Sequence, residues 1–227
     1  MARVRVGTSG WSYREWVGPF YPEGTSPARM LGVYASTFDT VEAHATYRRL
    51  PSAAALGRWV DAVPAGFRFA TKAHMGITHR RDLEGVEERV EAFLAAVAPL
   101  GPAMGPVLFS LPHHQPDLDR LDRILAALGG RAAAAFDVGP AWDRADVLDR
   151  LDAAGATLVL TDSPSIRPVG PIAYVRLRKG DYSDSELDAW AERLAKVVAE
   201  DRDAYVFFKH DDAASGPRLA QELRARG

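Results

Sequence analysis

The sequence predicts an α/β fold in which residues 1–227 form a single TIM-like (β/α)8 barrel domain. Stretches typical of strands alternate with stretches typical of helices about eight times, and such alternation implies parallel strands covered by helices. The connections are short, and no change of composition marks a domain boundary. A chain of 227 residues lies near the small end of the range for such barrels.

The first half of the chain contains four predicted strands, indicated by alternating or continuous apolar runs. These strands are predicted over Arg3–Thr8, Asp39–His44, Phe67–His74 and Pro106–Pro112. Residues that favour an N-cap, a proline at the first helical position and apolar residues at helical spacing predict the helices between them. These helices are expected over Pro27–Thr37, Ala53–Val63 and Gly85–Ala98.

The second half repeats the pattern, with one proline-rich loop over Ser163–Pro171. An open doubly wound sheet is the alternative fold. It normally carries a glycine-rich phosphate turn after its first strand, and Gly7–Gly10 is a poor match to that turn. The strands of this half are predicted over Ala132–Asp137, Ala156–Asp162, Ile172–Arg178 and Ala204–His210, and the helices over Asp117–Leu128, Asp143–Ala154, Ser183–Ala199 and Ala214–Arg226.

The composition excludes several classes of protein. The chain has no cysteine, which rules out disulfides, thiolate catalysis and cysteine-ligated metals. A net charge of -2 provides no global attraction to nucleic acid or to an anionic membrane. No apolar run suits a signal peptide, and none approaches the roughly 20 residues of a membrane span. We therefore expect a cytoplasmic protein with no membrane partner.

Polar side chains follow the predicted strands at the ends that meet around the mouth of such a barrel, where active sites lie. On the second strand Glu42 and His44 share one face, and Val41 and Ala43 share the other. A ring of buried charges costs desolvation free energy unless it is paired or serves a ligand. We predict a functional mouth; the alternative is a structural network of ion pairs. The candidate groups are Glu42, His44, Lys72, His74, Asp137, Asp162, Arg176, Arg178, Lys209 and Asp211, with Thr78 and His79 in a nearby loop.

The residue types favour acid–base chemistry on an anionic ligand. Glu42 and Lys72 are predicted to form a proton-transfer pair. The cations of the mouth favour a phosphate or a carboxylate. No cofactor is predicted; a divalent metal held by histidines and acids is an alternative, although the sequence has no HxH or HExxH spacing. Neither Ser9 nor Ser110 lies in a GxSxG elbow, which argues against a serine nucleophile.

A long aromatic segment follows the first strand. It contains Trp11, Tyr13, Trp16, Phe20 and Tyr21 among glycines and prolines. Loops of this length are usually functional or packed over something. These rings either cap the core, since each buries a large area, or form a stacking wall for a ring-bearing ligand.

Several short motifs resemble the YecE-like family, which is the domain of unknown function 72. The match runs from the first strand to about Pro112 and continues more thinly beyond it. The resemblance implies a TIM-like barrel, but it implies no reaction, because the family's activity is not established. The motifs are Gly7-Thr-Ser-Gly-Trp-Ser-Tyr13, Trp16, Gly18-Pro-Phe-Tyr-Pro22, Val41-Glu42, Thr46-Tyr47, Arg49-Leu-Pro51, Phe67-Arg-Phe69, Lys72, Thr78-His79, Gly105-Pro-Val-Leu108, Tyr174-Val-Arg176, Tyr182 and Trp190.

The chain departs from this family pattern mainly in its C-terminal half. His44 stands where the family usually has asparagine, and Ala135–Gly139 replaces an acidic-Phe-Arg-His run. Arg178 or Lys179 stands in place of a histidine, and Lys209–Asp211 replaces Asn-Asn-Asp. We therefore expect a divergent branch with a different ligand, or one that has lost the ancestral activity.

Three functions are compatible with these features. The first is an enzyme, such as a hydrolase or an isomerase, that acts on a small phosphorylated or sugar-like anion. The second is a nucleic-acid-binding or phosphodiester-processing barrel. The third is a non-catalytic binding protein. For the enzyme, Glu42 and Lys72 are the predicted catalytic residues, and the predicted substrate-binding residues are Trp11, Tyr13, His44, Tyr47, Arg49, His74, Thr78, His79, Asp137, Asp162, Arg176, Arg178 and Lys209.

Overall fold

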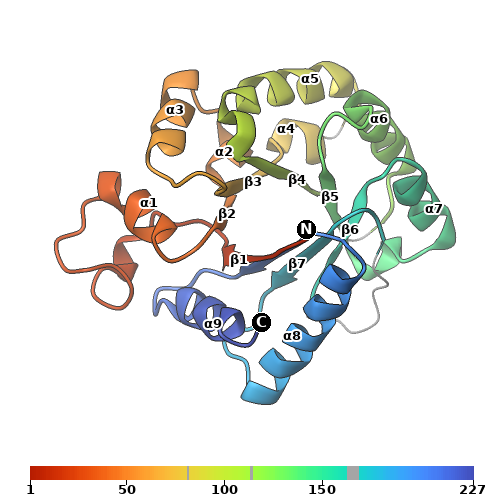
Figure 1. Ribbon diagram of the computed structural model, residues 1–227. Helices are drawn as coiled ribbons and strands as arrows, with labels where there is room; N and C mark the ends of the chain where they lie inside the picture. The colour runs from red at the N-terminus through yellow and green to blue at the C-terminus, as the bar shows by residue number, and fades with distance from the viewer. Residues whose placement is uncertain (81, 113–114, 163–168) are drawn as a thin grey trace.

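Eight parallel strands follow one another around a barrel in the computed structural model, with the helices on the outside (Figure 1). The prediction of a (β/α)8 fold is confirmed. The structure describes residues 1–80, 82–112, 115–162 and 169–227. The strands are β1 (Val4–Thr8), β2 (Thr40–Ala43), β3 (Arg68–Lys72), β4 (Met104–Ser110), β5 (Ala134–Asp137), β6 (Thr157–Leu160), β7 (Ala173–Leu177) and β8 (Ala204–Phe208).

The helices occupy the segments between the strands. In the described part of the connection between β6 and β7 there is no helix; residues 163–168 of the loop predicted there lie outside the described residues. The α-helices are α1 (Pro27–Ala35), α2 (Ala45–Arg48), α3 (Ala53–Asp61), α4 (Met75–Thr78), α5 (Val86–Val97), α6 (Leu118–Leu128), α7 (Ala145–Ala153), α8 (Asp184–Ala199) and α9 (Ser215–Arg224), and the 3-10 helices are Arg14–Trp16, Ala98–Ala103 and Pro140–Trp142.

One prediction about a local element is wrong. Thr78 lies in the short helix α4 and not in a loop. The helix begins after His74, whose Nδ1 accepts a hydrogen bond from the Gly76 N–H at 3.0 Å and caps the first turn. This local side-chain contact is not visible in hydrophobic periodicity, which is why the sequence indicated a loop.

The barrel interior beneath the mouth is filled by a buried cluster of aliphatic and aromatic side chains. Side chains alternate along a strand, so residues two positions apart point to the same side. The residues two positions after these buried ones therefore also point to the barrel axis. Ala70, Ala135 and Tyr174 each stand two positions before a predicted mouth residue. The cluster consists of Ala70, Leu108, Ala135, Val159, Tyr174, Tyr205 and Phe207, all buried.

The barrel is joined between β1 and β2 by a side chain instead of a continuous ladder. The hydroxyl of Tyr34, on α1, accepts a hydrogen bond from the Thr8 N–H at 2.9 Å and donates one to the Thr40 carbonyl at 3.1 Å. Beyond it, the Gly10 N–H donates directly to the Glu42 carbonyl at 2.9 Å. These bonds hold the segment after β1 against the end of β2.

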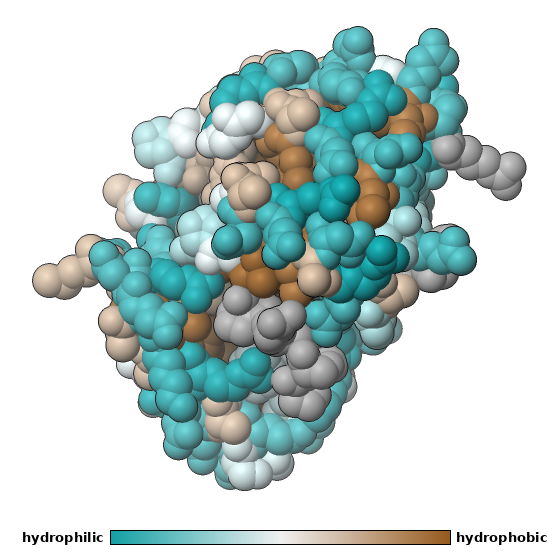
Figure 2. All heavy atoms as spheres, turned by 90° about the vertical axis from the view of Figure 1, so that its right-hand side faces the viewer, coloured by the Kyte–Doolittle hydropathy of each residue, from teal (hydrophilic) through white to brown (hydrophobic). Residues whose placement is uncertain are grey.

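The outer surface is predominantly polar where it is seen in Figure 2, which shows the side of the barrel on the right of Figure 1. Hydrophilic residues cover most of this side, and apolar residues show between them. Amphipathic helices that turn their apolar stripe to the strands produce such a surface. Among the described residues, no helix has the length and apolar character to cross a membrane. The cytoplasmic location stays a prediction.

The seam between β1 and β2 gives a test of packing. A Cβ at Gly7 would lie 2.2 Å from the Thr40 carbonyl oxygen and 2.8 Å from the Tyr34 hydroxyl. Gly7→Ala should therefore lower the free energy of unfolding by about 1–3 kcal/mol, as overpacking does. Chemical denaturation measures the change.

Gly57→Ala is the matched control, because nothing lies within 4 Å of a Cβ at this position in α3. It should raise stability by roughly 0.5–1 kcal/mol, as expected for alanine in a helix. Equal stability of the two variants would contradict the close approach of β1 and β2.

Candidate active site at the barrel mouth

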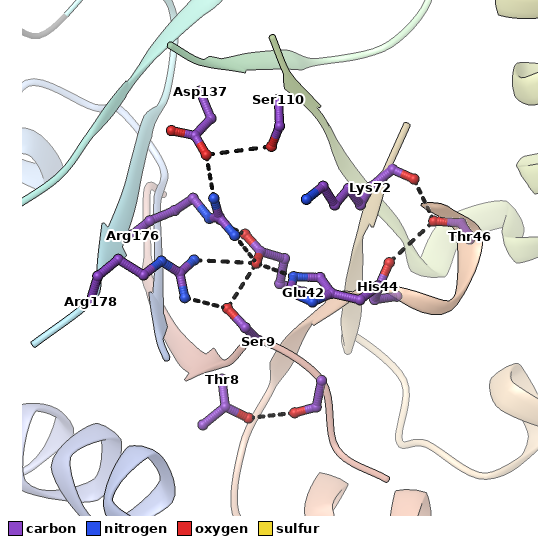
Figure 3. Close-up of polar contacts among 12 residues, drawn as sticks. Thr8, Ser9, Glu42, His44, Thr46, Lys72, Ser110, Asp137, Arg176 and Arg178 are labelled. Carbon is purple, nitrogen blue, oxygen red and sulfur yellow. Dashed lines mark hydrogen bonds and ion pairs between the residues drawn. The ribbon is translucent and has the colours of Figure 1, made fainter. Parts of the chain in front are cut away.

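A completely buried carboxylate, Glu42 at the end of β2, lies at the centre of the mouth (Figure 3). Arg176, from β7 on the opposite side of the barrel, binds it through two parallel hydrogen bonds. Its Nε donates to Oε2 and its Nη2 donates to Oε1, each at 3.0 Å. Bidentate pairing of this kind combines charge with fixed geometry.

Four further groups contact the same carboxylate. The Tyr174 hydroxyl donates to Oε2 at 2.8 Å, and the Ser9 hydroxyl donates to Oε1 at 2.8 Å. The His44 Nε2 lies 2.6 Å from Oε1, and the Arg178 Nη2 lies 3.4 Å from it. The carboxylate therefore has partners from β7 and its C-terminal end, from the residue after β2 and from the segment after β1.

This network keeps Glu42 ionised. Burial alone would raise the pKa of Glu42, but the charge of Arg176, the hydrogen bond from His44 and the charge of Arg178 hold that pKa well below its usual value. A carboxylate in this state carries no proton to donate near neutral pH. The acid–base role of Glu42 stays a prediction, and its contacts favour the role of a counter-ion that orients Arg176, Arg178 and His44.

Arg176 is also paired on its other side. Its Nη1 forms an ion pair with Asp137, at the end of β5, and the Ser110 hydroxyl donates to the same carboxylate oxygen at 3.4 Å. Burial would lower the pKa of Arg176, but Glu42 and Asp137 raise it. With a carboxylate on each side, Arg176 is a buried structural cation more than a free anion-binding group.

Lys72, at the end of β3, lies in a different environment. Its amine lies over the ring of Tyr47, 4.4 Å from the ring centre. In the part of the chain that the structure describes, no carboxylate is within ion-pair distance of this amine. Burial and the nearby charge of Arg176 lower the pKa of Lys72. The amine therefore carries a larger neutral fraction than an exposed lysine.

Arg178 follows β7 and reaches the same cluster. Its Nη1 donates to the Ser9 hydroxyl at 2.7 Å, and Ser9 in turn donates to Glu42. Asp162 accepts the Arg178 backbone N–H at 2.8 Å and the Tyr182 hydroxyl. Asp162 thus positions the backbone after β7, which directs the Arg178 side chain to the mouth.

The aromatic segment packs in the core and also reaches the mouth; its role as a stacking wall for a ligand stays a prediction. Trp11 is buried against Trp59 of α3, with ring centres 4.9 Å apart, and belongs to the core outside the barrel. Tyr13 is half-buried at the mouth, where its ring stacks on His210 with centres 4.6 Å apart. Its hydroxyl donates to the Ser9 carbonyl at 2.8 Å. Burial, reinforced by Glu42, raises the pKa of Tyr13 to about 12.

His210 is a site residue that the sequence reasoning missed. Burial and the charges of His44, Arg178 and Lys209 lower its pKa. The signal was available, because His210 lies within the three residues that replace the Asn-Asn-Asp of the family pattern. Ser9 and Tyr174 were also omitted, although Tyr174 alternates with Arg176 and Arg178 along β7.

The remaining predicted residues lie at the rim. His74 caps α4 and also lies 3.3 Å from the Arg48 carbonyl. Tyr47 contacts His79, and Thr78 is buried beneath them. Arg49 is exposed. Lys209 is exposed as well, and among the described residues it is outside the hydrogen-bonded network around Glu42.

The structure thus brings together the residues predicted on four strands. One mouth contains five of them together with His44 (Figure 3). We call these five the inner cluster: Glu42, Lys72, Asp137, Arg176 and Arg178. Within the described ranges, no three histidine or acidic side chains are arranged to hold a metal ion. The inner cluster therefore combines two carboxylates, two guanidinium groups and, among the described residues, one amine without an ion-pair partner.

Comparison with known proteins agrees with this architecture. A family model described as protein of unknown function DUF72 matches residues 5–226. The chain belongs to this family. The resemblance to the YecE-like family is confirmed.

Two curated relatives carry related names. YunF from Bacillus subtilis is 30% identical over 115 residues, which cover 48% of this chain and 40% of the relative. YecE from Escherichia coli is 29% identical over 109 residues, which cover 48% of this chain and 38% of the relative. The chain therefore matches less than half of the length of these relatives.

Solved structures show the same barrel. A DUF72 protein from Thermotoga maritima has a TM-score of 0.82 at 24% identity and covers 98% of both chains. A DUF72 protein from Enterococcus faecalis has a TM-score of 0.77 at 20% identity and covers 99% of this chain and 97% of its own. D-psicose 3-epimerase from Clostridium cellulolyticum, solved with D-tagatose, has a TM-score of 0.61 at 10% identity over 98% of this chain and 96% of its own. At these identities the likeness concerns the fold alone.

The buried pairing predicts a large effect of removing the Glu42 charge. Glu42→Gln leaves Arg176 and Arg178 without their shared counter-ion and should lower the free energy of unfolding by about 3–5 kcal/mol. Glu91→Gln is the control, since Glu91 pairs with Arg131 at the surface, where both side chains are about half exposed. It should cause no measurable change. Denaturant unfolding measures both changes. A loss of stability of equal size in the two variants would contradict the role of Glu42 as a buried counter-ion.

The low pKa of Glu42 predicts how this difference depends on pH. A group whose pKa is lower in the folded protein contributes stability above its unfolded pKa, and this contribution is lost as the pH falls towards the folded value. The stability difference between wild type and Glu42→Gln should therefore shrink below about pH 4, the ordinary range of a glutamate. Unfolding curves from neutral to acid pH measure it, and a difference independent of pH would disprove the assignment.

Proposed function

We propose that this DUF72 barrel is an enzyme that binds a small anionic substrate, phosphorylated or sugar-like, at its C-terminal mouth. The observation that supports this most is the composition of the inner cluster, in which three cations face two carboxylates. Both carboxylates are occupied by Arg176. An anionic ligand would supply a counter-ion to Lys72 and a closer one to Arg178 than Glu42.

Arg178 is the residue best suited to hold the anion. Its side chain is 27% exposed, whereas that of Arg176 is 12% exposed. Its contact with Glu42 is 3.4 Å long, so a closer oxygen could replace it at little cost. A guanidinium presents its donors in a planar fork that matches phosphate and carboxylate.

Lys72 supplies a group able to move protons. A lysine with a lowered pKa can act as a base near neutral pH, which an exposed lysine cannot do efficiently. Among the described residues, the imidazoles of His44 and His210 lie near this cluster and offer further proton acceptors and donors. These features favour an enzyme over a non-catalytic binding protein.

The nucleic-acid alternative finds less support. It requires aromatic side chains that are free to stack on bases. Trp11, Trp16 and Tyr21 are buried in the core, and Tyr13 is already stacked on His210. The remaining accessible rings suit a small ligand better than a strand of bases.

The anion-binding part of the proposal predicts stabilisation by inorganic phosphate or sulfate. Each should raise the melting temperature above that in chloride at matched ionic strength, because ligand binding to the folded state stabilises it. Arg178→Gln should weaken this binding roughly tenfold, equivalent to about 1.4 kcal/mol. Arg193→Gln is the control, since Arg193 stacks on Trp190 on α8, away from the mouth. No phosphate effect in the wild type, or equal effects of both variants, would refute the proposed anion site.

The catalytic part is tested with a panel of sugar phosphates followed by mass spectrometry and NMR. Wild-type protein should convert at least one member, and Lys72→Met should lose this turnover while it still melts cooperatively and binds phosphate. A ligand that binds the mouth and is never converted would identify a binding protein instead.

A further inference from the structure

We propose that Lys72 is a nucleophile that forms a Schiff base with the carbonyl carbon of an anionic aldehyde or ketone bound at the mouth. This inference rests on the proposed function and narrows its substrate class to small carbonyl compounds that carry a phosphate or a carboxylate. It assigns to Lys72 a covalent role in addition to proton transfer.

The amine of Lys72 is held in place without being neutralised by a partner. The ring of Tyr47 lies 4.4 Å from it on one side. The carboxylates of Glu42 and Asp137 are directed to Arg176. Within the described residues no acid forms an ion pair with Lys72, so an incoming carbonyl displaces no salt bridge. A lysine used only to stabilise the fold would be expected to have such a partner.

The direction of the side chain supports the same role. Figure 3 shows the Lys72 nitrogen pointing towards the side of the mouth that carries Ser110, Asp137 and Arg176. A carbonyl compound bound there would have its anionic group within reach of the cations and its carbonyl carbon near the amine. Burial and Arg176 favour the neutral amine, which is the nucleophilic form.

The covalent step balances without a further reactant. The nitrogen lone pair attacks the carbonyl carbon, the carbonyl π electrons move to oxygen, and one proton passes from nitrogen to that oxygen to give a carbinolamine. The nitrogen lone pair then expels the hydroxyl group, which takes up a second proton from solvent and leaves as water. The product is an iminium cation, and hydrolysis reverses both steps.

Asp137, whose charge acts on the Lys72 amine, can carry the first of these protons. Ser110 donates a hydrogen bond to one oxygen of Asp137, and Arg176 pairs with the same oxygen. The carboxylate of Asp137 can accept the proton of the attacking nitrogen through its other oxygen and pass it to the alkoxide oxygen, which completes the carbinolamine. The anionic group of the substrate would offset the positive charge of the iminium next to Arg176 and Arg178.

Pyridoxal 5′-phosphate followed by borohydride tests this directly, because the probe is a phosphorylated aldehyde and reduction makes its imine permanent. The chain has four lysines, Lys72, Lys179, Lys196 and Lys209, so peptide mapping resolves each one. The adduct should form mainly at Lys72, and excess inorganic phosphate should suppress it. Dihydroxyacetone phosphate and pyruvate, trapped in the same way, test non-aromatic carbonyl compounds.

Two matched variants complete the experiment. Lys72→Arg keeps the positive charge but has no nucleophilic amine, so it should lose the adduct and keep phosphate-dependent stabilisation. Lys196→Arg removes an exposed lysine on α8, outside the mouth, and should leave the Lys72 adduct unchanged.

The outcomes separate this inference from the proposed function. Phosphate stabilisation of the wild type without a Lys72 adduct from any of the three probes would overturn the Schiff base and leave the anion site standing. Absence of both phosphate stabilisation and adduct would overturn both. Labelling spread evenly over the four lysines, unaffected by phosphate, would also overturn the assignment.

Discussion

The arrangement of the mouth depends on one buried carboxylate. Glu42 accepts hydrogen bonds from Arg176, Tyr174 and Ser9 and contacts His44 and Arg178. An isolated charge in a low-dielectric interior costs desolvation free energy. The Glu42 carboxylate stays ionised because its neighbours compensate this cost. The cations are in turn fixed by the carboxylate before any ligand arrives. Such preorganisation is what makes charged groups effective at a binding or catalytic site.

The same pairing divides the cations into two classes. Arg176 has a carboxylate on each side and is largely consumed by the fold. Arg178 shares Glu42 at a longer distance, and Lys72 lies on an aromatic face with no acid partner among the described residues. Arg178 and Lys72 are therefore the cations that the proposed anion would meet. The sequence suggested two alternatives for these charges, a structural network of ion pairs or a functional mouth. The division of the cations shows that one set of residues can serve both.

Local periodicity predicted much of this site. Alternation along β2 and β7 indicated that Glu42 and Arg176 leave the apolar face, and the convergence of strand ends in a barrel placed them at one mouth. It could not predict that these two residues pair, since partner choice depends on side-chain reach across the barrel. The Tyr34 bridge between β1 and β2 and the burial of Trp11 under α3 were invisible for the same reason. Each depends on a tertiary contact between segments that have no common sequence pattern.

The central claim is that Glu42 holds a cationic mouth in readiness for an anion. A crystal structure of the protein grown in sulfate tests it most directly. The account predicts a tetrahedral anion that contacts the side chains of Lys72 and Arg178, with the Glu42–Arg176 pair unchanged beneath it. An empty mouth at high sulfate, or an Arg178 that points to solvent away from Glu42, would contradict it.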